Sequence, residues 1–209
     1  MELQYFGGNC VRINTKKTNV VIDDNLAELG VKSVTKADDI VLASNQELTK
    51  INTNAQLVIA QPGEYEVSNV SIQGVAARSH MDEESKKSTT IFKVVADDIR
   101  IVILGHIYPE LSDGQLEAIG MVDVLIIPIG GHGYTLDAIG ALKIIKKIEP
   151  KIVIPTHYAD TSLKYEVPQA ELADVLKELS MEPTDTVPKL KLKSSDLPEN
   201  MQLIVLERQ

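Results

Sequence analysis

The stretch VLIIPIGGHGY (Val124–Tyr134) joins an uninterrupted apolar run to two glycines and a histidine. A second stretch, KIVIPTHY (Lys151–Tyr158), places a histidine two residues after a similar run. Short apolar runs of this kind are typical of strands that are buried on both faces of a sheet. Between them, apolar residues at helical spacing predict a helix that Thr135 caps and that runs to about Ile148. The sequence therefore predicts a β-α-β unit with polar side chains at the strand ends.

Apolar runs separated by turn residues continue this pattern outward along the chain. In the first half we expect strands at Leu3–Phe6, Cys10–Asn14, Asn19–Asp23, Ile40–Ser44, Leu57–Ala60, Val70–Ala77, Thr89–Ala96 and Ile99–Leu104. In the second half we expect strands at Val122–Pro128, Lys151–Pro155, Val187–Leu192 and Gln202–Leu206, a helix capped by Ser112 and closed by Gly120, and a helix opened by Pro168. One domain over residues 1–209, made of sheets covered by helices, is the economical prediction.

Charge and composition exclude several classes of protein. Asp and Glu outnumber Lys and Arg by 30 to 21, which gives a net charge of −9 and disfavours binding to nucleic acid. The longest apolar stretch is far too short to span a bilayer, and the first residues do not resemble a signal peptide. Cys10 is the only cysteine, so an intramolecular disulfide is excluded. We therefore expect a cytoplasmic protein that does not bind membranes.

The chain has four histidines, and each follows an apolar run. They are His80, His106, His132 and His157. In open α/β sheets, ligands bind outside the carboxyl ends of the strands. If at least three of these imidazoles converge on one pocket, they would suit a transition-metal ion. The opposing hypothesis is that they are ordinary loop residues hydrogen-bonded to the backbone.

Seven phrases follow one another in an order that resembles the metallo-β-lactamase superfamily, and within it the small proteins named metal-dependent hydrolases. They are YFGGNCVRI (Tyr5–Ile13), VVIDD (Val20–Asp24), KADDIVLAS (Lys36–Ser44), PGEYEV (Pro62–Val67), ILGH (Ile103–His106), IPIGGHGYTLDA (Ile127–Ala138) and EPKIVIPTHY (Glu149–Tyr158). The resemblance implies a fold of the α/β (α+β) class. It is a four-layer αβ/βα sandwich, in which two mixed sheets pack face to face with helices outside.

The same resemblance also shows where this chain departs from the family. The defining motif H-x-H-x-D-H corresponds here to Asn45, Glu47, Thr49 and Lys50, and the usual bridging Asp corresponds to His106. His80 and His157 stand at the approximate positions of remaining ligands, and Asp23 at the usual Asp position.

Lys50 is the most telling replacement. A protonated ammonium repels a divalent cation and cannot coordinate it, and this one would instead pair with Glu47 or Asp23. The alternative is a solvated loop lysine.

Three functional hypotheses remain open. The leading one is a pseudoenzyme that has lost the binuclear site and binds a small ligand, such as an anion, or a protein partner. A rival is an active hydrolase with one divalent ion, Zn²⁺ being suitable, held by Glu47, His80, His106 and His157. The third is a structural subunit of a complex, with self-association into a homo-oligomer open. Asp23 and His132 are expected to line the pocket in each case.

Overall fold

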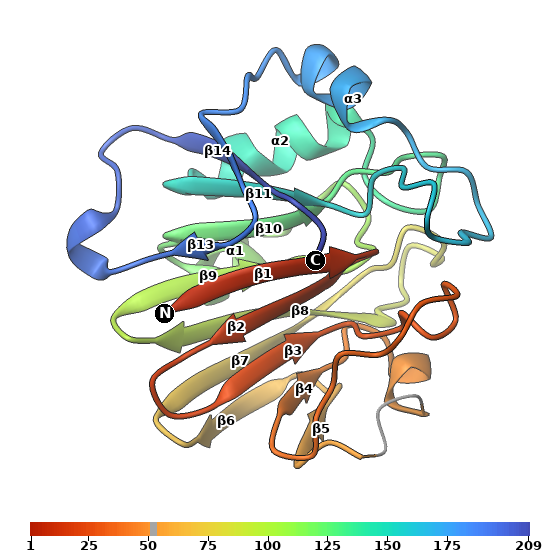
Figure 1. The fold of residues 1–209 in the computed structure, drawn as a ribbon. Helices are drawn as coiled ribbons and strands as arrows, with labels where there is room; N and C mark the ends of the chain where they lie inside the picture. The colour runs from red at the N-terminus through yellow and green to blue at the C-terminus, as the bar shows by residue number, and fades with distance from the viewer. Residues whose placement is uncertain (51–53) are drawn as a thin grey trace.

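Two β-sheets pack face to face and hold most of the apolar side chains between them (Figure 1). The computed structural model describes residues 1–50 and 54–209, with Lys50 described by its backbone only. The first sheet has six strands, in the order β13 (Leu190–Lys191), β1 (Glu2–Gly7), β2 (Cys10–Asn14), β3 (Asn19–Ile22), β4 (Ile40–Leu42) and β5 (Leu57–Ile59).

The second sheet has eight strands and contains the β-α-β unit predicted from the sequence. Its order is β12 (Asp185–Val187), β14 (Gln202–Leu206), β11 (Ile152–Thr156), β10 (Val124–Pro128), β9 (Ile99–Ile103), β8 (Thr89–Ala96), β7 (Val70–Ala77) and β6 (Gly63–Val67). Strands β9, β10, β11 and β14 run parallel to one another. Strand β8 is antiparallel to both of its neighbours, β7 and β9. β10 and β11 are buried throughout, as their uninterrupted apolar runs predict.

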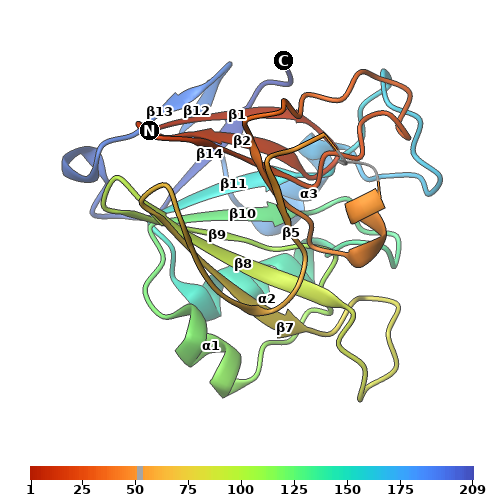
Figure 2. The same cartoon turned by 90° about the horizontal axis from the view of Figure 1, so that it is seen from below.

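Within the described residues, three α-helices cover the outer face of the eight-stranded sheet. They are α1 (Asp113–Ile119), α2 (Ala138–Ile148) and α3 (Leu172–Leu179), and their apolar residues share one core with that face. Figure 2 shows α1 and α2 on the side of this sheet that faces away from β1 and β2. None of the helices in the described part of the chain is both long enough and apolar enough to cross a bilayer.

The outer face of the six-stranded sheet has a different cover. Leu26 and Leu29, which follow β3, pack there with Leu163 from the loop after β11. The sandwich of two sheets is confirmed, but over residues 1–50 and 54–209 this fourth layer consists of loops and not of α-helices. The short 3-10 helix η1 (Gln46–Lys50) follows β4.

Three local predictions differ from the structure, and one strand is missing from them. Helix α2 begins after Asp137, whose side chain accepts a hydrogen bond from the Gly140 N–H, so the predicted cap at Thr135 is wrong. Thr135 instead accepts from the Gly131 N–H within the preceding loop. Helix α3 begins at Leu172, four residues after Pro168.

The region from 187 to 192 is not one strand, because β12 pairs with β14 in one sheet and β13 with β1 in the other. The predicted strands do not include β6, whose residues are largely exposed. The capping box of Ser112 and Gln115 and the closing Gly120 are confirmed.

The topology brings the carboxyl ends of strands from both sheets to one edge. Strand β7 is antiparallel to β8, and β8 is antiparallel to β9, so β7 ends on the same side as β9, β10 and β11. Gly105, directly before His106, lies so close to β4 that a Cβ on it would be 2.6 Å from the Ser44 Cβ and 2.9 Å from the Thr89 Oγ1. The two sheets therefore approach each other closely where the polar side chains gather.

We predict that Gly105→Ala lowers the free energy of unfolding by about 1–3 kcal/mol, because its methyl group would overlap Ser44. Gly114→Ala is the control, since no atom lies within 4 Å of a Cβ there and Ala favours a helix over Gly. Urea denaturation of both variants measures the difference. Equal stabilities would contradict the close approach of the sheets.

Candidate functional site

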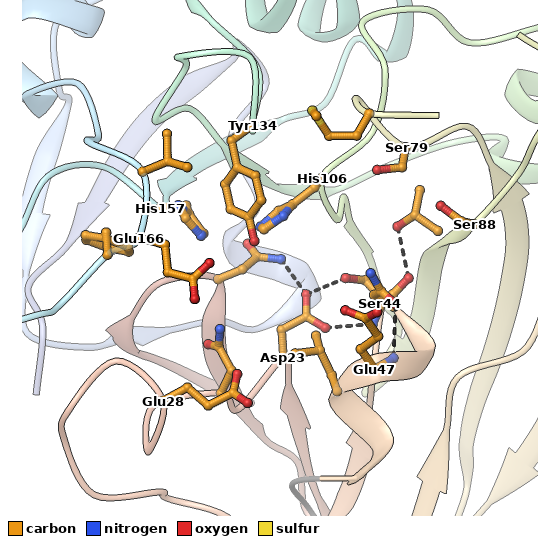
Figure 3. Close-up of a pocket in the computed structure, with 18 of the residues that line it drawn as sticks. Asp23, Glu28, Ser44, Glu47, Ser79, Ser88, His106, Tyr134, His157 and Glu166 are labelled. Atoms are coloured by element: carbon orange, nitrogen blue, oxygen red, sulfur yellow. Dashed lines mark hydrogen bonds between the residues drawn. The ribbon is translucent and has the colours of Figure 1, made fainter. Parts of the chain in front are cut away.

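A cavity of about 660 Å³ opens at this edge, between the ends of the two sheets (Figure 3). Asp23, Ser44, His106 and His157 reach it from the ends of β3, β4, β9 and β11. Most of the remaining lining comes from loops, with Glu47 and Leu48 in η1 and Thr89 at the start of β8. It consists of Asn9, Asn25, Glu28, Leu29, Asn45, Glu47, Leu48, Ser79, Met81, Asp82, Lys86, Ser88, Thr89, Tyr134, Lys164, Tyr165, Glu166, Val167 and Gln169.

Asp23 is at the base of the cavity and is held by three hydrogen bonds. Its carboxylate accepts from the Ser44 N–H at 2.6 Å, from the Ser44 Oγ at 2.8 Å and from the Asn9 Nδ2 at 2.8 Å. The Asn9 Nδ2 also donates to the Leu104 carbonyl at 3.1 Å, and the Asn9 Oδ1 accepts from the Thr156 Oγ1 at 2.7 Å. Through Asn9, the carboxylate of the first sheet is joined to two strand ends of the second.

The Asp23 carboxylate is almost completely buried, and burial raises its pKa above the ordinary value. Its hydrogen bonds from Ser44 and Asn9 favour the charged form and oppose this effect. Asp23 therefore lines the cavity as a hydrogen-bonded carboxyl group. Its hydrogen bonds give it a role in joining the sheets that the sequence did not reveal.

We predict that Asp23→Asn lowers the free energy of unfolding by about 3 kcal/mol. The new amide N–H₂ would face donors of Ser44 and Asn9, which leaves buried polar groups without partners. Asp38→Asn is the matched control, because Asp38 is exposed. The measurement is chemical denaturation at pH 7, and a loss no greater than that of the control would refute this role.

His106 and His157 form a close pair on one wall of the cavity. Their ring centroids are 4.8 Å apart, with an angle of 88° between the planes. The His106 ring also packs on Tyr134 at 4.4 Å, and the His157 ring on Tyr165 at 5.2 Å. The His157 Nδ1 lies 3.0 Å from the Gln169 Oε1, which fixes the orientation of that ring. Within residues 1–50 and 54–209, no hydrogen bond to the His106 ring is found.

Both imidazoles are held in the neutral form near pH 7. Burial lowers the pKa of His106 well below its ordinary value, and the neighbouring His157 and His80 lower it further. Burial also lowers the pKa of His157, while its contact with Gln169 opposes this effect. Two adjacent neutral rings can therefore coexist in this small space.

We predict that the protein loses stability as the pH falls below about 6.5, the ordinary histidine value. Below it the unfolded chain takes up protons that the folded His106 and His157 do not accept, which lowers the free energy of unfolding. Each such proton contributes a slope of up to about 1.4 kcal/mol per pH unit.

Urea denaturation at pH 7.5, 6.5 and 5.5 measures this slope. His106→Gln should reduce it, whereas His132→Gln, at an exposed loop position, should leave it unchanged. Parallel stability curves for wild type and His106→Gln would contradict the prediction.

The other two histidines do not line the cavity. His132 is exposed in the loop after β10, with a φ of 54°, so its predicted place in the pocket is corrected. That loop turns outward after Gly131 and presents Tyr134 to the cavity instead. His80 is outside the described lining; its backbone N–H donates to the His106 carbonyl at 2.9 Å, and its ring centroid lies 6.1 Å from that of Tyr108.

The four positions that correspond to the family motif lie in and before η1. Asn45 and Glu47 line the cavity, and the Asn45 Oδ1 accepts from the Glu47 N–H at 3.0 Å. Thr49 is outside the cavity, and its hydroxyl donates to the Gln46 carbonyl at 2.7 Å. The Lys50 side chain lies outside the described residues, so its predicted pairing with Glu47 or Asp23 stays a prediction.

The side chains in place do not fit the metal centre that the family resemblance implies. Across residues 1–50 and 54–209, no three His, Cys, Asp or Glu side chains are grouped so that they could hold a metal ion. Of the four residues predicted to share one ion, Glu47, His106 and His157 line the cavity and His80 does not. The donors on the cavity therefore support no chemical step through a metal ion.

Several lining residues carried no clear signal in the sequence. Tyr134 and Tyr165 contact the two cavity histidines, and Gln169 fixes one of them. Glu28 and Glu166 come from loops far apart in the chain. Tyr134 is the exception, because it lies in the glycine-rich loop around His132, which the sequence already marks as a candidate site. Nothing comparable marked Tyr165 or Glu166.

Comparison with known protein families supports this fold. The profile of the beta-lactamase superfamily domain matches residues 2–157, about three quarters of the chain. The chain belongs to the beta-lactamase superfamily. Its relatives include UPF0173 proteins, several of which are named metal-dependent hydrolases. The predicted family is thereby confirmed.

Two relatives illustrate how far the similarity extends. A UPF0173 protein of Pyrococcus abyssi is 23% identical over 180 residues, which cover 76% of this chain and 83% of the relative. A UPF0173 metal-dependent hydrolase of Thermoplasma acidophilum is 50% identical over 47 residues, but this match covers 21% of this chain and only 20% of that relative.

Solved structures agree with the two-sheet architecture. A metallo-beta-lactamase superfamily protein from Thermotoga maritima superimposes with a TM-score of 0.77 at 24% identity, covering 100% of this chain and 99% of the other. Igni18, a metallo hydrolase from Ignicoccus hospitalis, gives a TM-score of 0.61 at 18% identity, covering 99% and 94%. At these identities the superpositions support the fold alone.

Proposed function

We propose that this chain is a pseudoenzyme of its superfamily, which has lost the binuclear metal centre and binds a small molecule in the cavity. The observation that carries the proposal is the state of the pocket histidines. The rings of His106 and His157 pack edge to face, and His157 already contacts the Gln169 side chain. A protein with this pocket would recognise a ligand without the hydrolytic chemistry of a binuclear site.

The residues at the motif positions support this proposal. Asn45 and Thr49 make hydrogen bonds to nearby backbone groups of η1. In the family motif the same two positions carry metal ligands, whereas here their side chains stabilise the local backbone. Glu47 is exposed at the mouth of the cavity. A carboxylate there is suited to contact a ligand from solvent.

The cavity itself favours a small molecule over a protein partner. A concave space of about 660 Å³ lies within the range of small-molecule sites. Its lining mixes aromatic rings with carboxylates and amides, which is typical of selective recognition of one compound. A cytoplasmic location fits the proposal, since the only cysteine, Cys10, is a buried free thiol. A homo-oligomer stays a prediction that light scattering would test.

The rival proposal, an active hydrolase with one rewired metal ion, rests on the closeness of His106 and His157. Two neutral imidazoles 4.8 Å apart are a reasonable start for a zinc site, with Glu47 the third donor on the cavity. Such a site would require the two rings to rotate apart and Glu47 to turn inward. The metal content of the protein separates the two proposals.

We expect less than about a tenth of an equivalent of metal in protein purified without a metal-affinity tag. The same result is expected after incubation with excess Zn²⁺ and desalting, because a structural zinc site needs about four ligands and this pocket groups fewer. Elemental analysis by ICP-MS is the measurement.

The control separates specific from adventitious metal. About one metal ion per chain in the wild type, lost in His106→Ala and kept in His132→Ala, would establish the rewired site and overturn the pseudoenzyme proposal. Hydrolysis of ester or phosphodiester substrates that depends on added Zn²⁺ or Mn²⁺ would overturn it as well. Retained secondary structure by circular dichroism should accompany each variant.

A further inference from the structure

Four aromatic rings from three loops and a strand end form a continuous wall of the cavity. Tyr134 contacts His106 at 4.4 Å and His157 at 5.8 Å between ring centroids, and His157 contacts Tyr165 at 5.2 Å. The Tyr165 hydroxyl accepts from the Gly8 N–H and donates to the Tyr158 carbonyl, both at 3.2 Å, which fixes that ring. The faces of tyrosine rings such as those of Tyr134 and Tyr165 attract cations, including cations that carry apolar groups.

Carboxylates surround the same space. Glu28, Glu47 and Glu166 all line the cavity and are exposed, so their charges are available to a ligand. Figure 3 shows Glu166 and Glu28 on one side of Asp23 and Glu47 on the other, with the ring of Tyr134 above Asp23. Their field is felt at the tyrosine: burial raises the pKa of Tyr134, and Glu166 and Glu47 raise it further.

Basic side chains offset only part of this charge. Lys86 and Lys164 are the two lysines in the described lining of the cavity. The Lys86 ammonium lies 3.2 Å from the Asp82 carboxylate, which already pairs with it. Among the described lining residues this leaves Lys164 against the three exposed glutamates, so the described part of the mouth carries a net negative charge. A negative mouth attracts positively charged ligands and repels anions.

We propose that the ligand of this cavity is a small organic cation, an ammonium group bearing apolar substituents. The wall of rings formed by Tyr134, His106, His157 and Tyr165 would receive the apolar surface of its head group. Glu28, Glu47 and Glu166 would balance its charge. This inference rests on the proposed function, because it names the ligand class of the same pocket, and it replaces the small anion considered from the sequence.

An organic cation fits this lining better than a bare metal ion does. A metal ion needs three or more donors directed at one point, and the side chains in the described ranges offer no such group. An alkylammonium head is several ångströms wide and is held by diffuse attraction to ring faces and nearby carboxylates. A cavity of about 660 Å³ has room for it together with a polar tail.

Isothermal titration calorimetry at low ionic strength tests the proposal with three probes. Choline is the cation, 3,3-dimethylbutan-1-ol is its uncharged analogue of the same shape, and inorganic phosphate is the anion. We expect choline to bind at least about tenfold more tightly than the uncharged analogue, and phosphate not to bind. Because the attraction is electrostatic at the exposed mouth, raising the salt to about 0.5 M should weaken choline binding.

Two variants test the two halves of the site. Tyr134→Leu keeps an apolar side chain but removes a ring face, and should weaken choline binding about fivefold. Glu166→Gln keeps the shape and removes one charge, and should weaken it about threefold. Glu178→Gln, an exposed change on α3 outside the cavity, is the matched control and should bind as wild type does.

The outcomes distinguish this inference from the proposed function. Equal binding of choline and its uncharged analogue, binding of phosphate alone, or no binding of any probe at about 20 mM would overturn the cation inference. None of these results changes the metal content that tests the pseudoenzyme proposal. Conversely, one equivalent of zinc held by His106 would overturn the pseudoenzyme proposal, whether or not choline binds.

Discussion

The buried carboxylate of Asp23 is the interaction on which the arrangement of the site depends. It ends β3 in the first sheet, and Asn9 links it to Leu104 and Thr156, which end strands of the second. Burying this charge costs free energy, which the hydrogen bonds of Asn9 and Ser44 offset. The network thereby fixes the distance between two sheets that are otherwise joined by nondirectional apolar packing.

The shape of the cavity depends on this join. With the strand ends held together at its base, the loops that continue from them must pass outward and surround a space. His106 and His157 are brought into contact there, and burial keeps both uncharged. Loops on the outer face of the first sheet contribute Glu28 and Glu166 to the rim. The result is a pocket with neutral rings inside and carboxylates at its mouth.

The fold was largely predictable because its signals are local. Uninterrupted apolar runs mark β10 and β11, and a capping box marks α1. Local signals failed where neighbouring segments compete. Thr135 and Asp137 are both suitable helix caps. Because the Thr135 hydroxyl accepts a hydrogen bond from the Gly131 N–H within the loop, Asp137 caps the helix instead. The chain between residues 185 and 191 divides between two sheets, which is decided by partners distant in sequence.

By itself, the sequence predicted the family and the two-sheet sandwich, which are confirmed. It also predicts that positions 45, 47, 49 and 50 replace the family's metal-binding motif. These depend on residue type and order along the chain. Only the tertiary structure decided which side chains meet. It exposed His132, left His80 outside the cavity lining, and brought Tyr134 and Tyr165 into contact with the histidine pair. The physical reason is that loop direction after a strand depends on packing across the sheets, which no local pattern encodes.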